Sequence, residues 1–433
     1  MRFTGLYGPS RLKFHYEIVL GKMLQPKAKT PVDRELPYLR AANILDGRID
    51  ADDLKTMWFA PSEIAKYDVK PGDLFILEGG DVGRGAIWDS AIANVGFQNS
   101  VHRIRPLPGN SNRFALYWFN HLKSVGYFDL ISSKATLAHF TGEKAKETPF
   151  PEVDLPTQKR IAEFLDRETA RINQLIENRK AFLDLISEKR TALTIQAMDG
   201  TILGAGHDGE EGWFGHLPRD WPVWRAKFLF REGQECSATG EEELLTVSHI
   251  TGVTPRSDKD VNMFLADTME GYKLVSRGDV VVNTMWAWMG AMGVSPVSGL
   301  ISPSYGVYTP TVDAFEPNYL DLILRSLPFI AEVNRRSKGV WSSRLRLYPD
   351  AFLDIRLPVP AIEVQQESLN ALQTMIHREE QLADLSRQSL DCLREFRSAL
   401  ITAAVTGHID VETWGRRGDT DRRLDVIEEE LSV

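Results

Sequence analysis

Residues 151–202 read PEVDLPTQKRIAEFLDRETARINQLIENRKAFLDLISEKRTALTIQAMDGTI, and residues 358–409 read PVPAIEVQQESLNALQTMIHREEQLADLSRQSLDCLREFRSALITAAVTGHI. The two stretches align without a gap at an offset of 207 positions, with 15 identities in 52 positions. Self-similarity at one fixed offset is the signature of a repeated architecture. The sequence therefore predicts a chain of two related halves, with an internal pseudo-two-fold repeat.

Each of these stretches predicts one long helix. Proline at the entrance favours an extended approach, because it fixes φ and lacks a backbone donor. About 42 residues without Pro or Gly then follow in each copy, up to Gly200 or Gly407, which provides a C-terminal cap signal. We expect helices over about 158–199 and about 365–406.

Apolar residues recur along both helices in alternating steps of three and four. This 3.5-residue period is typical of coiled coils, and two such helices in one chain can pack on each other over roughly 60 Å. The predicted seam comprises Ile161, Leu165, Ile172, Leu175, Phe182, Ile186, Leu193, Leu372, Ile376, Leu382, Leu393, Phe396 and Leu400. Two independent bundle helices are the alternative interpretation.

The segments outside the helices, residues 1–150 and 206–357, repeat more weakly. KPGDLF at 70–75 aligns with SRGDVV at 276–281, and each is a Gly-Asp turn that leads into an apolar strand. Short strands, glycine turns and one or two helices predict two mixed α/β globular domains. The fold class is α+β, with helical regions at 151–205 and 358–410 and an acidic tail at 411–433.

Composition sets limits on these predictions. The chain has 433 residues, 43% of them apolar, which is enough for two to four packed domains. Cys236 and Cys392 lie too far apart to suggest a disulfide framework or a zinc site, and we expect both to be reduced, buried thiols. No signal peptide or long apolar run is evident, which favours a cytoplasmic protein.

Net charge, −9 over the whole chain, is unevenly distributed. Residues 1–157 carry +2 and 158–205 carry +1, whereas 206–357 carry −5 and 358–433 carry −7. Bulk charge therefore argues against a histone-like DNA binder. We expect this chain to bind DNA weakly by itself.

Common catalytic signatures are missing from the sequence. EGGDVGRG at 78–85 resembles a phosphate loop but lacks the Gly-Lys-Ser/Thr ending, so we expect a hairpin turn there. No Asp/Asn-Pro-Pro-aromatic tetrapeptide is present to hold a flipped adenine. We therefore predict no catalytic, cofactor-binding or metal-binding residue in this chain.

Basic residues do gather locally among Trp, Asn and Gln. Arg and Lys contact phosphates and guanine edges, and Asn and Gln suit adenine. The DNA-binding candidates are Arg84, Gln98, Asn99, Arg103, Arg105, Asn283, Trp286, Arg335, Arg336, Lys338, Trp341, Arg344 and Arg346. A solvated loop with arginine stems packed over aromatic faces is the alternative.

The order of these segments resembles the specificity (S) subunit of type I restriction-modification systems. LPYLRAANILDGRID and KPGDLFILEGGDVGRGA carry the resemblance in the first half, and GYKLVSRGDVVVNTMWAWMGAMGVSP with ISPSYGV carries it in the second. The two long helical stretches are similar to the family's conserved regions. One departure is that Pro156 of the first helix entrance is matched by Glu363 in the second.

The resemblance implies two target-recognition domains, each reading one half of a bipartite DNA site, held apart by an antiparallel coiled coil. It also implies partners: two methyltransferase (M) subunits, which bring S-adenosylmethionine, and restriction (R) subunits, which bring ATP- and Mg-dependent cleavage. The chain itself would have no catalytic activity and no cofactor. The acidic tail is either disordered or a partner contact.

Two other hypotheses remain open from the sequence. One is a self-contained DNA methyltransferase or nuclease with unfamiliar motifs. The other is a coiled-coil scaffold that does not bind DNA.

Overall fold

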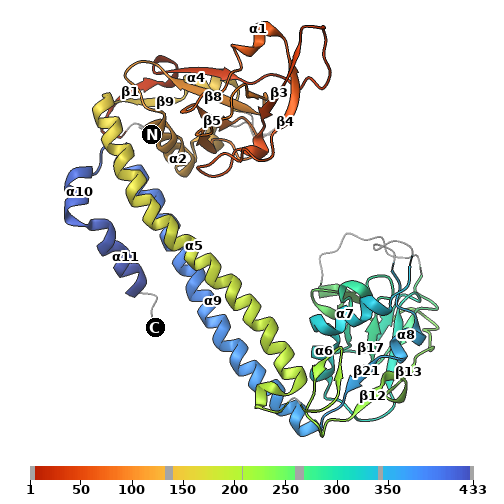
Figure 1. Ribbon diagram of the computed structural model, residues 1–433. Helices are drawn as coiled ribbons and strands as arrows, with labels where there is room; N and C mark the ends of the chain where they lie inside the picture. The colour runs from red at the N-terminus through yellow and green to blue at the C-terminus, as the bar shows by residue number, and fades with distance from the viewer. Residues whose placement is uncertain (1–4, 132–139, 207, 259–267, 340–344, 430–433) are drawn as a thin grey trace. The chain divides into compact units, whose positions relative to one another are not determined.

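Two helices, far longer than the others in the described chain, organise the computed structural model (Figure 1). They are α5 (Leu155–Asp199) and α9 (Ile362–Val405), close to the predicted bounds. The structure describes residues 5–131, 140–206, 208–258, 268–339 and 345–429. Pro156 lies in the first turn of α5, where its missing N–H group has no intrahelical partner to lose.

The chain divides into two compact units, and the division falls inside both long helices. Unit 1 comprises residues 1–181 and 385–433, and unit 2 comprises residues 182–384. These limits differ from the predicted domain limits because the ends of the helices pack into the globular parts. In unit 1, Tyr117 donates to Asp166 of α5 and His121 contacts Thr402 of α9.

Unit 1 is built on a four-stranded antiparallel sheet with the strand order β2-β8-β5-β6. A second sheet has the order β4-β3-β7, and β1 pairs with β9. The strands are β1 (Gly8–Arg11), β2 (Tyr16–Leu20), β3 (Arg34–Leu39), β4 (Lys55–Phe59), β5 (Leu74–Leu77), β6 (Gly85–Ile87), β7 (Gly96–Phe97), β8 (Val101–Pro106) and β9 (Pro149–Glu152). The short helices are η1 (Leu12–Phe14), η2 (Ala41–Asn43), α1 (Pro61–Ile64), α2 (Asn112–Ser124), α3 (Tyr127–Ile131) and α4 (Gly142–Glu147).

Unit 2 repeats the four-stranded sheet with the order β13-β20-β17-β18, and β12 pairs with β21 as β1 pairs with β9. Its strands are β10 (Glu211–Gly212), β11 (Gly215–His216), β12 (Val223–Arg225), β13 (Phe230–Glu232), β14 (Leu245–Ser248), β15 (Gly252–Pro255), β16 (Lys273–Val275), β17 (Val280–Val282), β18 (Met292–Val294), β19 (Gly299–Ile301), β20 (Gly306–Pro310) and β21 (Arg356–Pro358). Its helices are η3 (Thr201–Leu203), η4 (Ala226–Phe228), η5 (Arg256–Asp258), η6 (Ala287–Met289), α6 (Pro317–Arg325), α7 (Leu327–Arg336) and α8 (Pro349–Leu353).

The Gly-Asp turns that align in the sequence have the same hydrogen bonds in the two units. The Asp73 carboxylate accepts from the Lys70 backbone N–H, and the Asp279 carboxylate accepts from the Ser276 N–H, both at 2.8 Å. The glycine of each turn has a positive φ, 91° at Gly72 and 94° at Gly278, which a side chain would strain. Each turn starts the central strand of its sheet, so the weak repeat is a repeat of folded structure.

A buried glutamine joins each long helix to its globular part in the same way. The Gln158 side-chain oxygen accepts from the Ser111 N–H at 2.9 Å, and that of Gln365 accepts from the Glu316 N–H at 2.8 Å. Both glutamines are fully buried. Ser111 and Glu316 are the N-cap residues of α2 and α6, so each bond satisfies a donor at a helix start.

The long helices contact each other, and in unit 2 they run antiparallel. Lys189 pairs with Glu379 at 2.6 Å, and Leu193, further along α5, lies with Leu372, earlier in α9. Eight predicted seam residues are buried: Ile161, Leu165, Ile172, Ile186, Leu193, Leu372, Leu393 and Leu400. Three others are half-buried: Leu175, Ile376 and Phe396.

Two predicted seam residues are wrong. Phe182 is 36% exposed and Leu382 is 38% exposed. The heptad continues instead through the half-buried Leu183 and the buried Ala383, one position along. The prediction followed the largest apolar side chains, whereas the register of the helices places small and polar residues in the middle of α9, including Glu379, Ser386 and Ser389.

The acidic tail forms two helices, α10 (Val411–Arg417) and α11 (Asp419–Glu429), so the expectation of disorder is wrong over these residues. Within unit 1 they lie against the first half of α5, where Arg160 pairs with Glu412 and Arg171 with Asp421. Cys236 and Cys392 are free and exposed, contrary to the expected burial.

The paired glutamines give a stability test with an internal control. Gln158→Ala or Gln365→Ala should lower the free energy of unfolding by about 1–3 kcal/mol, because a buried N–H group loses its acceptor. Gln174 and Gln381 are also identical in the two repeats but are exposed. Their alanine variants should change stability by less than about 0.5 kcal/mol. Denaturant unfolding of the full chain measures both effects, and equal losses at the buried and exposed pairs would contradict the repeat interpretation.

Candidate nucleic-acid interface

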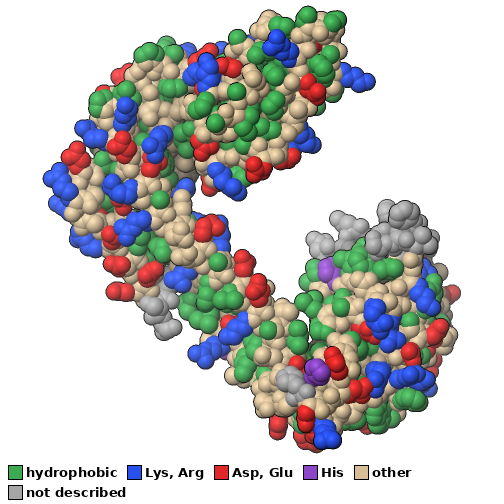
Figure 2. Space-filling model, in the orientation of Figure 1, with side chains coloured by type: hydrophobic (Ala, Val, Ile, Leu, Met, Phe, Trp, Pro, Cys, Tyr) green, Lys and Arg blue, Asp and Glu red, His purple; other side chains and the backbone are tan. Residues whose placement is uncertain are grey.

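Bulk charge does not mark a DNA-binding face. On the face seen in Figure 2, Lys and Arg side chains are interspersed with Asp and Glu. The candidates must therefore be judged by where their side chains lie. Two of the surfaces they form involve corresponding hairpin loops, β5–β6 in unit 1 and β17–β18 in unit 2.

In unit 2, the structure gathers several candidates from separate segments. The β17–β18 loop contains η6, and Trp286, the N-cap residue of η6, is 51% exposed and stacks with Trp288 at 6.4 Å between ring centroids. Lys338 and Arg346 are exposed and pair as an antiparallel bridge, with two backbone hydrogen bonds of 2.9 Å. The next residue, Leu347, donates to the Thr284 carbonyl of the η6 loop. Cations and an aromatic pair thus lie on adjoining segments.

Arg335 and Arg336, at the end of α7, are anchored to one carboxylate. Arg335 Nε lies 2.7 Å from Glu332, and Arg336 also reaches Asp354 at 3.3 Å. Burial by itself would raise the pKa of Glu332, but the hydrogen bonds from the two arginines outweigh it, so the pKa lies below its ordinary value. The carboxylate stays ionised and holds both guanidinium groups, with Arg335 still 68% exposed.

In unit 1, the β5–β6 loop is the hairpin that the sequence predicts at EGGDVGRG. Arg84 lies 3.5 Å from Asp81, which Lys123 of α2 also contacts. Arg84 and Lys123 line a groove with Arg397 of α9. Lys123 and Arg397 were not predicted, because residues this far apart in the chain give no local signal that they share a surface.

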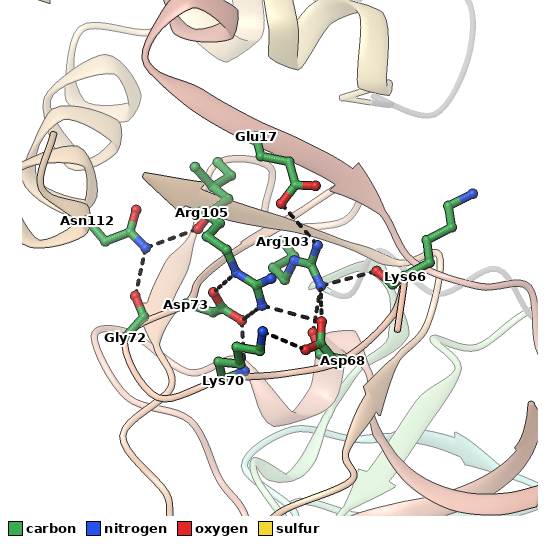
Figure 3. Close-up of polar contacts among 10 residues, drawn as sticks. Glu17, Lys66, Asp68, Lys70, Gly72, Asp73, Arg103, Arg105 and Asn112 are labelled. Atoms are coloured by element: carbon green, nitrogen blue, oxygen red, sulfur yellow. Dashed lines mark hydrogen bonds and ion pairs between the residues drawn. The ribbon is translucent and has the colours of Figure 1, made fainter. Parts of the chain in front are cut away.

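Arg103 and Arg105 form an internal network instead of a DNA surface (Figure 3). Arg103 is only 2% exposed and donates to Asp68 and to the carbonyls of Lys66 and Asp68. Burial, followed by the neighbouring Arg105, lowers its pKa. The prediction for Arg103 is therefore wrong, because a buried guanidinium with internal acceptors cannot reach a phosphate.

Arg105 is a quarter exposed and makes a two-pronged contact with Asp73, at 2.8 and 2.7 Å. The hydrogen bond with Asp73 raises the pKa of Arg105. Asp73 also caps the Gly-Asp turn, so Arg105 ties strand β8 to that turn. The guanidinium group of Arg105 therefore stabilises the fold of unit 1 through Asp73.

The remaining candidates divide by burial. Asn283 is buried and donates to the Tyr305 hydroxyl at 2.9 Å, so it supports the β17–β18 loop, and its predicted role in reading DNA is wrong. Gln98 and Asn99 are half-exposed next to strand β7. Trp341 and Arg344 lie outside the described residues.

Other classes of site were also considered. Within the described ranges, no three His, Cys, Asp or Glu side chains are grouped as metal ligands would be. None of the described helices is long and apolar enough to span a membrane.

Part of the chain is similar in sequence to a known protein family. Residues 17–184 match the family model described as the type I restriction modification DNA specificity domain. No curated protein matches the chain in sequence. The matched range covers the globular part of unit 1 from Glu17 onward and the first two thirds of α5, which together are less than half of the chain.

The fold matches over nearly the whole length. A chain from a structure titled "Structural basis underlying complex assembly and conformational transition of the type I R-M system" superposes with a TM-score of 0.62 at 15% identity, covering 94% of this chain and 98% of that one. The HsdS subunit from Thermoanaerobacter tengcongensis gives a TM-score of 0.45 at 15% identity, covering 91% and 97%. The S subunit from M. genitalium gives 0.36 at 12% identity, covering 92% and 96%.

The structure is a duplicated α+β unit on two long contacting helices. Residues 17–184 are thus similar to the type I restriction modification DNA specificity domain, and the chain as a whole has the fold of a chain from a type I R-M structure.

The two Gly-Asp turns provide a matched electrostatic test. Asp73 is paired with Arg105, whereas Asp279 accepts a hydrogen bond from Thr309 and lies near Arg231, and burial outweighs both and raises the pKa of Asp279. Asp73→Asn should cost about 1.5–3 kcal/mol at neutral pH, because Arg105 loses a charged partner.

Asp279→Asn should behave differently. Since the folded protein binds the Asp279 proton more tightly than the unfolded chain, wild-type stability falls as pH rises from the ordinary carboxyl pKa through the raised value. Asparagine carries no charge, so the variant should gain stability relative to wild type over that rise. Unfolding of the full chain between about pH 4 and pH 8 measures this difference. A difference independent of pH would contradict the assignment.

Proposed function

We propose that this chain selects the DNA sequence on which a type I restriction-modification complex acts. Residues 1–150 and 206–357 would be its target-recognition domains, and each would read one half of a bipartite site. The long helices would set the gap between the half-sites and dock two methyltransferase subunits. Methylation of adenine with S-adenosylmethionine, and cleavage with ATP and Mg, would belong to the partner subunits in the cytoplasm.

The observation that carries this proposal is the duplicated recognition unit. The same four-strand order, Gly-Asp turn and buried glutamine occur in both units. The loops at the β5–β6 and β17–β18 hairpins differ in length and side chains: Arg84 in one and Trp286 in the other. A common frame with different loops suits a protein whose two halves read different sequences.

Exposed cations on these frames favour DNA as the ligand. In unit 2, Lys338 and Arg346 are exposed on a segment that is hydrogen-bonded, through Leu347, to the loop that carries the stacked Trp286 and Trp288. In unit 1, Arg84 and Lys123 line one groove. Cations position a duplex through its phosphates, while neighbouring polar and aromatic groups contact base edges.

The mixed charge on the face seen in Figure 2 suggests that affinity is shared with partners. Acidic side chains occur among the cations on the face seen in Figure 2, and the net charge is −9. Few phosphates can then be neutralised by this chain alone. The complex, rather than the isolated chain, is the proper species for binding experiments.

Salt dependence tests the unit 2 surface. In a complex with the methyltransferase subunits, Lys338→Ala or Arg346→Ala should each reduce the slope of log affinity against log salt by about 0.9, because each variant loses one phosphate contact. Arg219→Ala is the control, since Arg219 is also exposed in unit 2 but lies outside this surface. Slopes equal to wild type in both test variants would remove these cations from the DNA interface.

Helix length tests the role proposed for the coiled coil. Inserting one heptad after Arg179 of α5 and one after Leu385 of α9 keeps the seam in register, because Arg179 faces Ser386. Seven residues add about 10 Å to each helix. Mapping the methylated sites should then show the same half-sites separated by about three more base pairs, since one base pair rises about 3.4 Å.

Insertion into α5 alone provides the control. It leaves seven residues of one helix without partners and should abolish site-specific methylation. An unchanged gap after the paired insertion would show that the helices do not set the spacing.

A further inference from the structure

A short motif occurs once in each unit and is not part of the surfaces described above. Residues 11–14 read Arg-Leu-Lys-Phe, and residues 225–228 read Arg-Ala-Lys-Phe. Each motif ends the strand that pairs with the last strand before a long helix, β1 with β9 and β12 with β21. The two motifs therefore occupy corresponding places in the two units.

The motifs are held by the same contacts. The residue between Arg and Lys is fully buried in both, Leu12 and Ala226, and its N–H donates to the carbonyl of Thr148 or Ile355. The arginine pairs with a carboxylate just before the last strand of its unit: Arg11 with Glu147, and Arg225 with Asp354 at 2.9 Å. In unit 1, Lys13 pairs with Glu147 as well. The backbone then turns through a short 3-10 helix, η1 or η4.

These contacts turn the phenylalanine outward. Phe14 is 65% exposed and Phe228 is 62% exposed. In each motif the lysine ammonium lies over the ring, at 5.2 Å from the Phe14 centroid and 5.3 Å from the Phe228 centroid. The result is a rigid apolar ring with a cation over it, present twice in one chain.

Internal packing does not explain this arrangement. An exposed phenylalanine contributes little to the stability of its own unit, and single exposed apolar residues are ordinary. Here, however, sequence, exposure and cation geometry coincide at two corresponding places. A ligand that engages both motifs must present the same surface twice, which points to two copies of one protein.

The local charge favours a protein over DNA. The arginine of each motif is already paired with a carboxylate, Glu147 or Asp354, so it is not free to pair with a phosphate. In unit 2 the groove beside Phe228 is lined by Val223, Trp224, Arg225 and Arg356, with Trp224 44% exposed. Aromatic residues and arginine are enriched at protein interfaces.

We propose that the two Arg-X-Lys-Phe motifs are equivalent docking points for the two methyltransferase subunits, and this inference rests on the proposed function. Each partner copy would offer an apolar pocket for the phenylalanine ring, with carboxylates at its rim for the lysine. The motifs would thus supply one contact per copy beside the start of each long helix.

The test uses the full chain expressed with its methyltransferase subunit, with the stoichiometry measured by native mass spectrometry and the affinity by titration. Wild type should take up two copies. Phe14→Ser or Phe228→Ser should weaken one copy at least tenfold, so that one copy remains at concentrations where wild type holds two. The double variant should lose both copies at those concentrations.

The controls are Leu130→Ser in unit 1 and Ile250→Ser in unit 2, which are 70% and 72% exposed but belong to no repeated motif. They should bind like wild type. All variants should unfold at the wild-type temperature, because the replaced side chains are exposed.

The contrary outcomes are distinct. If wild type binds two copies and the double variant does so with unchanged affinity, the docking inference fails while the proposed function stands. If the double variant keeps both copies but loses affinity for duplex DNA, the motifs are DNA contacts and the inference is again overturned. If wild type binds no methyltransferase subunit, both fail.

Discussion

The packing of α5 against α9 is the constraint on which the rest of the molecule depends. Each compact unit contains the first part of one long helix and the last part of the other. Neither unit can therefore form without segments of both long helices. In unit 1, Tyr117 and His121 of one short helix contact α5 and α9 respectively. In unit 2, Tyr319 donates to the Met198 carbonyl near the end of α5, while Gln365 at the start of α9 caps α6. The two globular parts are therefore tied to the helices by specific buried hydrogen bonds, which are costly to leave unmade.

Comparison of the two units distinguishes the features that they share from those that differ between them. Strand order, the Gly-Asp turns and the buried glutamines form a common frame. The loops on that frame diverge, and so do the charges beneath it. Arg105 pairs with Asp73 in unit 1, whereas in unit 2 burial outweighs the effects of Thr309 and Arg231 and raises the pKa of Asp279. A frame that tolerates such differences can carry two independent recognition surfaces. The repeated Arg-X-Lys-Phe motifs belong instead to the shared part, as expected for contacts with two identical partners.

Much of this architecture could be predicted from the sequence. The helices, the turn alignment and the hairpin at EGGDVGRG follow from periodicity and from turn residues, which act locally. Burial of individual polar residues could not be predicted in the same way. Arg103 and Asn283 resemble exposed contacts in the sequence, but Asp68 and Tyr305, distant in the chain, give them internal partners. The predicted burial of Phe182 and Leu382 in the seam is wrong for a related reason. The register between two helices is set by the whole seam and not by the largest side chain. Disorder of the tail was expected because of its charge. The arginines of α5 that pair with the tail lie about 250 residues away in the sequence, so no local pattern shows these pairs.

In the proposed function, two related units of this chain read two separate DNA sequences at a fixed distance. Mapping methylated adenines across a genome that carries this chain with its methyltransferase partner tests it most directly. The expected result is two short defined sequences separated by a gap of constant length in which any base is accepted. Exchange of residues 206–357 for those of a relative should change one sequence and leave the other. A single continuous recognition sequence, or a change in both halves after that exchange, would contradict it.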